Sequence, residues 1–350
     1  MLRTPLLRLA ALLVLALIIS ACAAQPAPIQ SEPAASPAPA GSLVIYSGRN
    51  ENLVGPLLEQ FSAETGIAVE ARYGDTAEMA ATILEEGANS PADVFFGQDA
   101  GALGALAQAG RLAELPGDLL QQVDARFRDP DARWVGASGR ARVLVYNTDL
   151  VQPQNLPNDI WALTEPQWQG KIGWAPSNGS FQAFVTALRV LEGDEAARRW
   201  LEGMIANDVK VYSGNSAIVE AVAQGEIEAG LVNHYYLYQH LAQKDANAPL
   251  ANHFFPGSGA GALINVAGAG VVDTSENPAA AGRFIAFLLS QPAQEYFASQ
   301  TYEYPLAGEG IELSAGLLPL SDIAAPDIDL GNLEDLQGTL EMLQAVGALN

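Results

Sequence analysis

Cysteine and basic residues are scarce in this sequence. Of its 350 residues only one is a cysteine, Cys22, so no disulfide can form within the chain. Against 40 Asp and Glu stand 17 Lys and Arg, which gives a formal net charge of −23. Nucleic acid is excluded as a partner, because a phosphate backbone requires a basic protein surface. We interpret the acidity as a contribution to solubility rather than as the mark of a particular ligand.

The sequence also contains none of the catalytic motifs that would indicate common enzyme classes. A serine hydrolase would need a G-x-S-x-G turn and a zinc protease an H-E-x-x-H helix, and neither occurs. The glycine-rich stretch PGSGAGAL has no complete G-x-G-x-x-G dinucleotide fingerprint. No paired general acid and base accompany the helix ends described below. We therefore expect a protein that is not an enzyme.

The first 22 residues differ from the rest of the chain. Arg3 and Arg8 form a short basic region, residues 9–19 are continuously apolar, and small residues lead up to Cys22. This pattern resembles a bacterial lipoprotein signal. The alternative, a single membrane anchor, is disfavoured because the apolar run is shorter than the roughly 20 residues of a membrane span. We expect a signal peptide at residues 1–22, with Cys22 lipidated as the first residue of the mature protein.

Residues 23–41 consist mainly of alanine, proline and serine and predict a flexible tether. A lipid at one end of this tether would hold the folded part at the cell membrane, outside the cytoplasm. Loss of Arg3 and Arg8 with the signal leaves 15 Lys and Arg against 40 Asp and Glu, a mature net charge of −25.

From Ser42 onward, β-branched or aromatic runs alternate with segments of helical periodicity. This succession predicts an α/β protein with a parallel, doubly wound sheet. A second series of strands and helices follows the first, which predicts two lobes. We expect the strand at 140–146 to pass between the lobes and the glycine-rich strand at 261–272 to return. Further strands are predicted at 42–47, 67–73, 92–96, 171–176, 209–213 and 228–233, and helices at 52–64, 76–86, 102–109, 181–191, 195–205, 217–224, 278–289 and 292–299.

Three predicted strands of the second lobe run into a helix through an asparagine, in WAPSNGSFQAF, VYSGNSAIVEA and AGLVNHYYLYQ. Asn178, Asn215 and Asn233 therefore each have an ordinary explanation as helix N-caps. Three helix N-termini at one sheet edge would also direct free N–H groups toward a common point and bind an anion. Gly179 and Ser180 favour the anion interpretation, because glycine permits close backbone approach and serine adds a hydroxyl donor.

Tyr235 and Tyr236 follow the third of these junctions directly. One interpretation is a helix start with one ring in the core and the other half exposed. The alternative is that both phenol oxygens converge on a ligand. A phenol is protonated at neutral pH, and a strongly charged cation favours the phenolate. Ferric iron is the expected cation, because it prefers anionic oxygen ligands, with a phosphate or carbonate completing its coordination.

The succession of motifs resembles the bacterial ferric-iron-binding proteins, the substrate-binding components of iron ABC importers. The resemblance covers Ser42 to Asn350 and rests on YSGRNENLV, SPADVFFGQDAGAL, SGRARVLVYN, WQGKIGWAPSNGSFQAF, YSGNSAIVEAVAQGEIEAGLVNHYYLYQ and EYPL. It implies a type II periplasmic-binding-protein fold, with two hinged α/β lobes around a ligand cleft. We expect the first lobe at 42–141 plus about 266–315, and the second at 142–265 plus about 316–350.

The same resemblance implies that Tyr235 and Tyr236 bind the metal, and that five residues surround a synergistic anion. These residues are Asn178, Gly179, Ser180, Asn215 and Asn233. Two positions depart from the pattern, since Asn50 stands where phosphate-using members have a histidine ligand and Gln98 where they have a glutamate. Asn50 and Gln98 remain candidate neutral ligands, with Glu51, Asp99 or water as alternatives.

Three arginines are further candidates for the anion site. Arg140 and Arg142 lie two residues apart on a predicted strand and would point to one face, toward the anion or into a salt bridge between lobes. Arg49 would approach the anion from the first lobe. We do not expect His234, His240, Tyr238 or His253 to be ligands, since the resemblance assigns no such role to the position of His234.

The expected function is therefore capture of ferric iron with a synergistic anion and its delivery to an ABC permease and ATPase by a monomeric protein. A hinge motion would close the first lobe over the iron. The alternative is a binding protein in which the tyrosines stack on an organic cation, a polyamine or a sugar.

Overall fold

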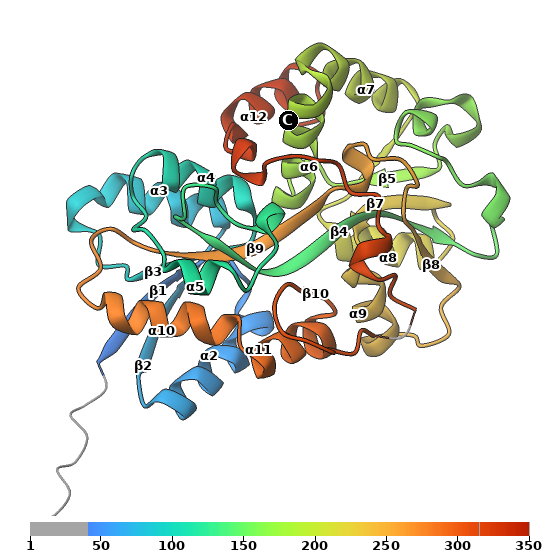
Figure 1. Ribbon diagram of the computed structural model, residues 1–350. Helices are drawn as coiled ribbons and strands as arrows, with labels where there is room; N and C mark the ends of the chain where they lie inside the picture. Colours follow the sequence, from blue (N-terminus) through green and yellow to red (C-terminus); the bar gives the residue numbers. More distant parts are fainter. Residues whose placement is uncertain (1–40, 315, 350) are drawn as a thin grey trace, which may run out of the picture. The chain divides into compact units, whose positions relative to one another are not determined.

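The computed structural model describes residues 41–314 and 316–349. The expected signal peptide at 1–22, the lipidated Cys22 and nearly all of the tether lie outside these residues. Within the described ranges, no helix is both long and apolar enough to cross a bilayer. The elements form a mixed α/β structure around one twisted sheet (Figure 1).

The amino-terminal part is a parallel β-α unit repeated three times. Its parallel strands β1 (Ser42–Ser47), β2 (Ala68–Tyr73) and β3 (Val94–Gly97) alternate with helices α2 (Glu51–Thr65), α3 (Thr76–Glu86) and α4 (Ala100–Gln108). Helix α2 begins where Asn50 Oδ1 accepts a hydrogen bond from the Asn52 N–H, and it ends at Gly66 with φ of 71°. The sequence predicts β1 and α3 with these same bounds.

A long central strand, β4 (Val135–Asn147), connects the two halves of the sheet. All 13 of its residues are buried. Residues 135–141 pair antiparallel with β9 (Ile264–Val271), whereas residues 142–147 pair with β7 (Ala229–Asn233) or β8 (Leu250–His253). The strand therefore changes partners between Ala141 and Arg142. This arrangement agrees with the prediction that it passes from one half to the other.

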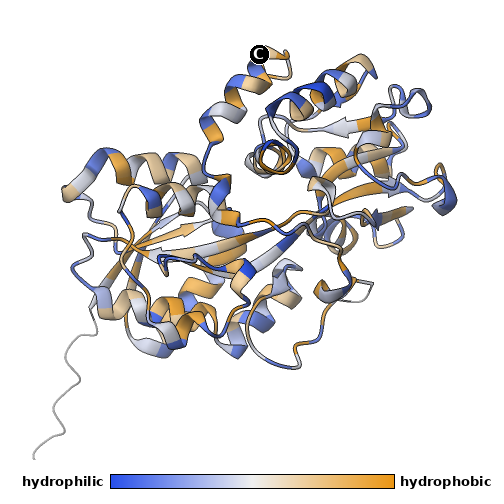
Figure 2. Cartoon of the chain, turned by 45° about the horizontal axis from the view of Figure 1, so that its top comes forward, coloured by the Kyte–Doolittle hydropathy of each residue, from blue (hydrophilic) through white to orange (hydrophobic). Residues whose placement is uncertain are grey.

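The second half of the sheet has the strand order β4-β7-β5-β6, and helices cover it. Strand β5 (Ile172–Trp174) lies parallel to both β7 and the two-residue strand β6 (Lys210–Val211). The helices in chain order are α6 (Gly179–Glu192), α7 (Asp194–Ala206), α8 (Asn215–Ala223) and α9 (Tyr235–Gln243). Figure 2 shows apolar residues along the central strands and polar residues on outward helix faces.

Three clusters of buried apolar side chains lie in the described residues. The first joins β1, β2 and β3 with α2, α3, α4, β9 and α10 (Pro278–Leu288), and the others lie around α6, α7 and α8. Leu317, Leu330 and Leu333 belong to the first cluster, whereas Met342 and Leu343 of α12 (Leu336–Ala345) belong to the second. We propose two lobes along these lines, with the carboxyl-terminal segment shared between them rather than assigned to the second.

Two features of the carboxyl-terminal third differ from the helix predicted at 292–299. Helix α11 (Gln291–Tyr296) continues as a π-helical turn, Phe297–Thr301, and Tyr302 follows with φ of 60°. Short strand β10 (Tyr304–Pro305) then pairs with β4 near Gly139. The extra residue of the π turn re-aims the chain toward the central strand.

Candidate functional site

The tyrosine pair lies at the carboxyl end of β7, directly at the start of α9. His234 is the N-cap residue, and Tyr235 and Tyr236 are the first two residues of the helix. Their rings stack with centroids 4.4 Å apart and an interplanar angle of 28°. Tyr235 is 1% exposed and Tyr236 is half-buried. The Tyr235 hydroxyl has no hydrogen-bond partner among the described residues.

Burial keeps the Tyr235 phenol protonated in the absence of a counter-charge. It raises the pKa of Tyr235 well above its ordinary value, and the adjacent Tyr236 raises it further. Arg140 acts in the opposite direction and lowers this pKa. Ionisation of Tyr235 at neutral pH therefore requires a strong positive charge close to its oxygen.

The three asparagines look like equivalent helix caps in the sequence, but they occupy different positions in the structure. Asn178 is a true N-cap of α6, because its Oδ1 accepts from the Ser180 N–H at 3.1 Å. Asn215 is instead the first helical residue of α8, after an N-cap at Gly214. Asn233 is the last residue of β7. Capping therefore explains Asn178 and leaves the side chains of Asn215 and Asn233 to another explanation.

The side chains of Asn178, Ser180 and Asn215 form one polar cluster. Asn215 Nδ2 donates to Asn178 Oδ1 at 3.2 Å and to Ser180 Oγ at 3.3 Å. The Asn215 side chain is 3% exposed, and its Oδ1 has no partner among the described residues. Gly179, the first residue of α6, is exposed, and no atom lies within 4 Å of a Cβ built on it. Side chains at the N-termini of α6 and α8 are therefore in hydrogen-bonding contact.

Arg142 lies next to the tyrosine pair and is held from three sides. Its Nη2 donates to the Leu231 carbonyl at 3.1 Å, and its Nη1 donates to Asn233 Oδ1 at 3.4 Å. Its guanidinium also stacks 5.5 Å from the Phe181 ring and 5.3 Å from the Phe184 ring. Burial lowers the pKa of Arg142 to about 9, and Tyr235 and Tyr236 act on it in the raising direction.

Arg140 lies on the other side of the point where β4 changes partners. It is 1% exposed, and Nη2 makes its one hydrogen bond in the described residues, to the Val266 carbonyl at 3.4 Å. Its charge lowers the pKa values of both Tyr235 and Asp99. Burial is the larger effect on Asp99 and raises the pKa of that carboxyl. Neither Arg140 nor Arg142 forms an ion pair with any described residue.

Unsatisfied polar atoms accumulate around these residues. Buried polar groups are almost always hydrogen-bonded, so a local concentration of unpaired ones indicates a ligand site. Within the described ranges the unpartnered buried atoms here are Arg140 Nε and Nη1, Arg142 Nε, Asn233 Nδ2, Asn215 Oδ1 and Tyr235 Oη. Four of these six atoms are nitrogen donors, and three of them belong to the two arginines. The set suits an anion next to a metal bound by phenol oxygens.

Arg49 forms an ion pair of its own, and its role at the anion remains a prediction. It is fully buried, and its Nη2 donates to both carboxylate oxygens of Glu303 at 2.9 and 2.8 Å. Ser138 and Thr301 hydroxyls donate to the same carboxylate at 2.8 and 3.2 Å. The charge of Arg49 is therefore neutralised by Glu303.

The candidate ligands from the amino-terminal half are weaker than the tyrosines. Asn50 is exposed, and its Oδ1 is already used to cap α2. Gln98 is half-buried, and its backbone N–H donates to Thr76 Oγ1 at 3.2 Å. No group of three or more His, Cys, Asp or Glu that could hold a metal occurs among the described residues. Asn50 and Gln98 remain predictions, with Gln98 having the freer side chain.

His234 is occupied elsewhere, which supports its omission from the ligands. Its Nδ1 accepts from the Ala141 N–H at 3.1 Å, and its Nε2 lies 2.8 Å from the Tyr302 carbonyl. The ring therefore carries its proton on Nε2 and links β4, α9 and the turn after the π helix. His253 Nε2 likewise contacts the Pro157 carbonyl at 2.6 Å.

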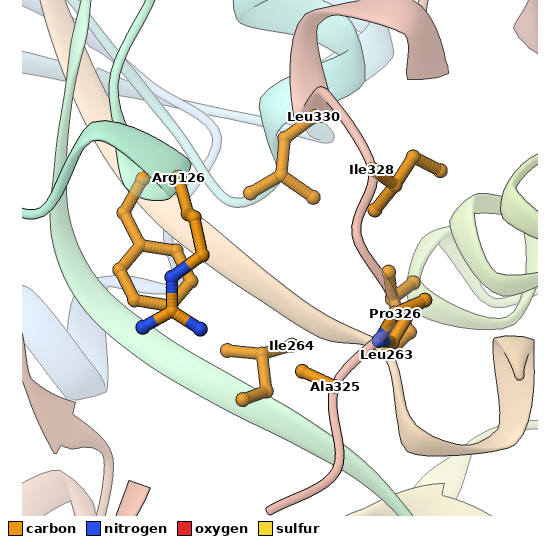
Figure 3. A pocket seen from close by; sticks show the side chains of 8 residues that line it. Arg126, Leu263, Ile264, Ala325, Pro326, Ile328 and Leu330 are labelled. Atoms are coloured by element: carbon orange, nitrogen blue, oxygen red, sulfur yellow. The ribbon is translucent and has the colours of Figure 1, made fainter. Parts of the chain in front are cut away.

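A cavity elsewhere in the molecule has a different chemistry. It lies between the start of β9 and residues 325–330, and its walls are apolar apart from the Arg126 guanidinium (Figure 3). Arg126 is paired with Asp124 at 3.2 Å. Such walls offer a hard metal ion no ligand oxygen, so the tyrosine site is the better candidate.

Comparisons with known proteins identify the family of this chain. Residues 57–315 match the family model of bacterial extracellular solute-binding proteins. The chain is 32% identical over 309 residues to the Fe(3+)-binding periplasmic protein of Serratia marcescens, across 88% of this chain and 90% of that protein.

Solved structures with the same architecture include two iron complexes. Iron-bound HitA from Pseudomonas aeruginosa has a TM-score of 0.82 at 33% identity, over 87% of this chain and 99% of that one. The Trichodesmium protein in complex with iron and citrate has a TM-score of 0.77 at 30% identity, over 88% and 99%. The expected type II periplasmic-binding-protein fold is thereby confirmed. The chain belongs to the bacterial extracellular solute-binding proteins and, among them, to the ferric-iron-binding family.

Proposed function

We propose that this protein captures ferric iron outside the cytoplasm, together with a synergistic phosphate or carbonate, and delivers it to an ABC permease driven by an ATPase. The observation that carries the proposal is the juxtaposition of the stacked Tyr235 and Tyr236 with unpaired donors of Arg140, Arg142 and Asn233. Phenol oxygens supply the metal ligands, and the donors face the counter-anion.

Tyr235 and Tyr236 provide the hard anionic oxygens that ferric iron prefers. Both phenols would lose their protons to solvent as the metal arrives, because the cation favours the phenolate. Burial opposes this ionisation for Tyr235, so a weakly charged cation would not bring it about. The site therefore discriminates in favour of a trivalent ion.

The charges around the tyrosines require an anion. Two phenolates leave one positive charge on ferric iron, and Arg140 and Arg142 add two that no described carboxylate pairs with. Asp99 offsets one of these when ionised, and burial disfavours its ionisation. A dianionic carbonate or phosphate offsets two of these three positive charges and accepts hydrogen bonds from Asn178, Ser180 and Asn215 as well as the arginines. Asn50 and Gln98, both neutral, add no charge.

Delivery follows from family membership and from the amino-terminal sequence. A lipid on Cys22 and the tether at 23–41 would keep the protein at the cell membrane, where a monomer can dock on the permease. Closure of the two proposed lobes would enclose the iron, and reopening would release it. The protein would act as a carrier and perform no catalysis.

An organic cation, a polyamine or a sugar stacked on the tyrosines is the alternative ligand. Two buried arginines beside the rings repel a cation. The two rings stack on each other at 4.4 Å, so the faces between them are not available to a ligand. These contacts favour iron with an anion.

Titration of metal-free protein with ferric iron in carbonate or phosphate buffer tests the proposal. We expect a visible phenolate-to-iron absorption band at one iron per protein, and its loss in the Tyr235→Phe, Tyr236→Phe double variant. Tyr238→Phe is the matched control, because Tyr238 is a half-buried tyrosine on the same helix that stacks on Tyr302 instead. A double variant that binds iron and keeps the band would place the metal elsewhere.

A further inference from the structure

The carboxyl-terminal segment touches two helices whose N-termini border the site. It comprises the 3₁₀ helix η9 (Leu330–Leu333) and helix α12, and we call residues 330–345 the strap. Helix α4 contacts η9, and helix α6 contacts both η9 and α12. Figure 1 shows α12 beside α6, on the side of the sheet where α4 also lies.

The contact with α4 is a close backbone approach. A Cβ on Gly101 would lie 2.4 Å from the Leu333 carbonyl oxygen, and one on Gly104 would lie 2.5 Å from the Gly331 carbonyl oxygen. Only glycine allows η9 to lie this near to the helix. Leu330 and Leu333 are 3% and 2% exposed and complete the first apolar cluster. The strap is therefore held against α4 by close packing on the two glycines and by the buried leucine side chains.

The contact with α6 is polar and directional. Arg189 Nη1 donates to the Asp335 carbonyl and to Thr339 Oγ1, both at 3.0 Å, and Arg189 Nη2 pairs with Asp335 Oδ2 at 2.8 Å. The hydroxyls of Thr186 and Thr339 lie 2.7 Å apart, and both residues are buried. These bonds fix the first turn of α12 to the last turns of α6.

The two anchored helices belong mainly to different apolar clusters, although Ala187 of α6 lies in the first, and both begin at the site. Ala100, Leu103 and Leu106 of α4 lie in the first cluster, whereas Phe181, Phe184 and Leu188 of α6 lie in the second. Asp99, whose pKa is lowered by the charge of Arg140, caps α4 by accepting a hydrogen bond from the Ala102 N–H at 3.1 Å. Asn178 caps α6. Seven residues of chain, Leu333 to Thr339, thus connect helices from the two proposed lobes.

We infer that the strap is a tether that limits how far the N-termini of α4 and α6 separate, and so controls release of the bound ligand. This inference rests on the proposed function for the identity of the ligand. Strands β4 and β9 pair antiparallel in the sheet and carry the chain between its two halves, so the proposed lobes can rotate about this pair. The strap, anchored on the helices away from the sheet, restrains that rotation. Breaking either anchor should loosen both helix ends.

Gly104→Ala and Arg189→Gln test the two anchors separately. The added methyl in Gly104→Ala has no room, whereas Gly282→Ala on α10 meets no atom within 4 Å and is the matched control. Arg199→Gln is the control for Arg189→Gln, since Arg199 is 59% exposed and contacts Glu195 at 3.8 Å. In iron-loaded protein we expect each anchor variant to lose iron to a chelator roughly tenfold faster than its control.

Amide hydrogen exchange in the metal-free protein tests the tether independently of iron. Each anchor variant should speed exchange in the first turns of both α4 and α6, including the helix it does not touch. Faster exchange confined to the mutated helix, or iron release equal to that of the controls, would overturn the inference. If wild-type protein gave no iron band but each anchor variant still sped amide exchange in both helices, the proposed function would fail and the tether would stand. Variants that do not fold are identified by near-ultraviolet circular dichroism, and the milder Thr339→Val then replaces Arg189→Gln.

Discussion

Arg49 and Arg140 are both buried cations, yet their surroundings assign them different roles. Arg49 has a bidentate carboxylate partner in Glu303, and that carboxylate is held by two further hydroxyls. Arg140 has one long hydrogen bond to a backbone carbonyl and no carboxylate partner in the described chain. Both arginines leave Nε and Nη1 without a hydrogen-bond partner there, so the difference lies in the ion pair of Arg49 with Glu303. A buried cation paired with a carboxylate is part of the fold, whereas a buried cation without one indicates that a ligand anion binds beside it.

The two arginines should therefore respond oppositely to replacement by methionine. Arg49→Met leaves the Glu303 carboxylate without its cation and should lower the free energy of unfolding by about 3–5 kcal/mol. Arg140→Met removes an unpaired buried charge and should leave that free energy unchanged or raise it, while weakening anion-dependent iron binding by on the order of tenfold. Urea denaturation of metal-free protein and iron titration check both expectations. A strong destabilisation by Arg140→Met would mean that Arg140 is structural.

At the scale of single residues, the sequence predicts which residues form the candidate site but not the contacts that each of them makes. The adjacent tyrosines and the strand-to-helix asparagines were recognisable, because polar residues at carboxyl ends of parallel strands share one edge. Arg142 stood out less, although its spacing from Arg140 was visible. Its contacts with Leu231, Asn233 and two phenylalanines are long-range. Glu303, the partner of Arg49, lies 254 positions away in the sequence, so no local pattern predicts this ion pair.

At the scale of elements, the junction between β7 and α9 depends on a neutral histidine. Burial is the main cause that lowers the pKa of His234 to about 4, with Arg140 acting in the same direction and Glu303 against it. Nδ1 of the neutral ring accepts a hydrogen bond from the Ala141 N–H. Protonation would put a hydrogen on Nδ1, so that two donors would face each other. Since the unfolded chain binds this proton at a higher pH, near 6.5, the unfolded state gains protons first as pH falls.

Metal-free protein should accordingly lose stability as pH falls from about 6.5 to about 4, with up to about 3 kcal/mol due to His234. His234→Asn keeps an acceptor toward Ala141 and cannot titrate, so the pH dependence of its unfolding should be shallower by that amount. His240→Asn, the same change at another buried histidine on α9, is the control. Equal slopes in wild type and His234→Asn would contradict the account of this junction.

Elements with strong local patterns were predictable, and those formed by distant contacts were not. Strand β1 and helix α3 have the predicted bounds because their apolar patterns are strong and Gly87 ends the helix. Strand β10 has two residues and forms through pairing with β4, and β8 is half-buried along its length. The π turn at Phe297–Thr301 has no local signal that distinguishes it from a helix. The strap likewise depends on glycines of α4 far earlier in the chain.

At the scale of the whole folded part, β4 and β9 connect the two sides of the sheet, and the site lies where β4 changes partners. Arg140 pairs in register with Asn265 of β9, and Arg142 pairs with Asn233 of β7. The two arginines of the proposed anion site thus lie on either side of the point where β4 changes partners. Rotation of the proposed lobes there would change the distance between Arg140 and Tyr235 and so would couple ligand binding to lobe closure.

A crystal structure of the protein loaded with ferric iron in carbonate or phosphate tests this account most directly. We expect both phenolate oxygens of Tyr235 and Tyr236 on the metal, with the anion bridging iron to Arg140 and to the Asn178–Ser180 turn. Iron bound elsewhere, or iron on this site with both tyrosine hydroxyls turned away from it, would contradict the account.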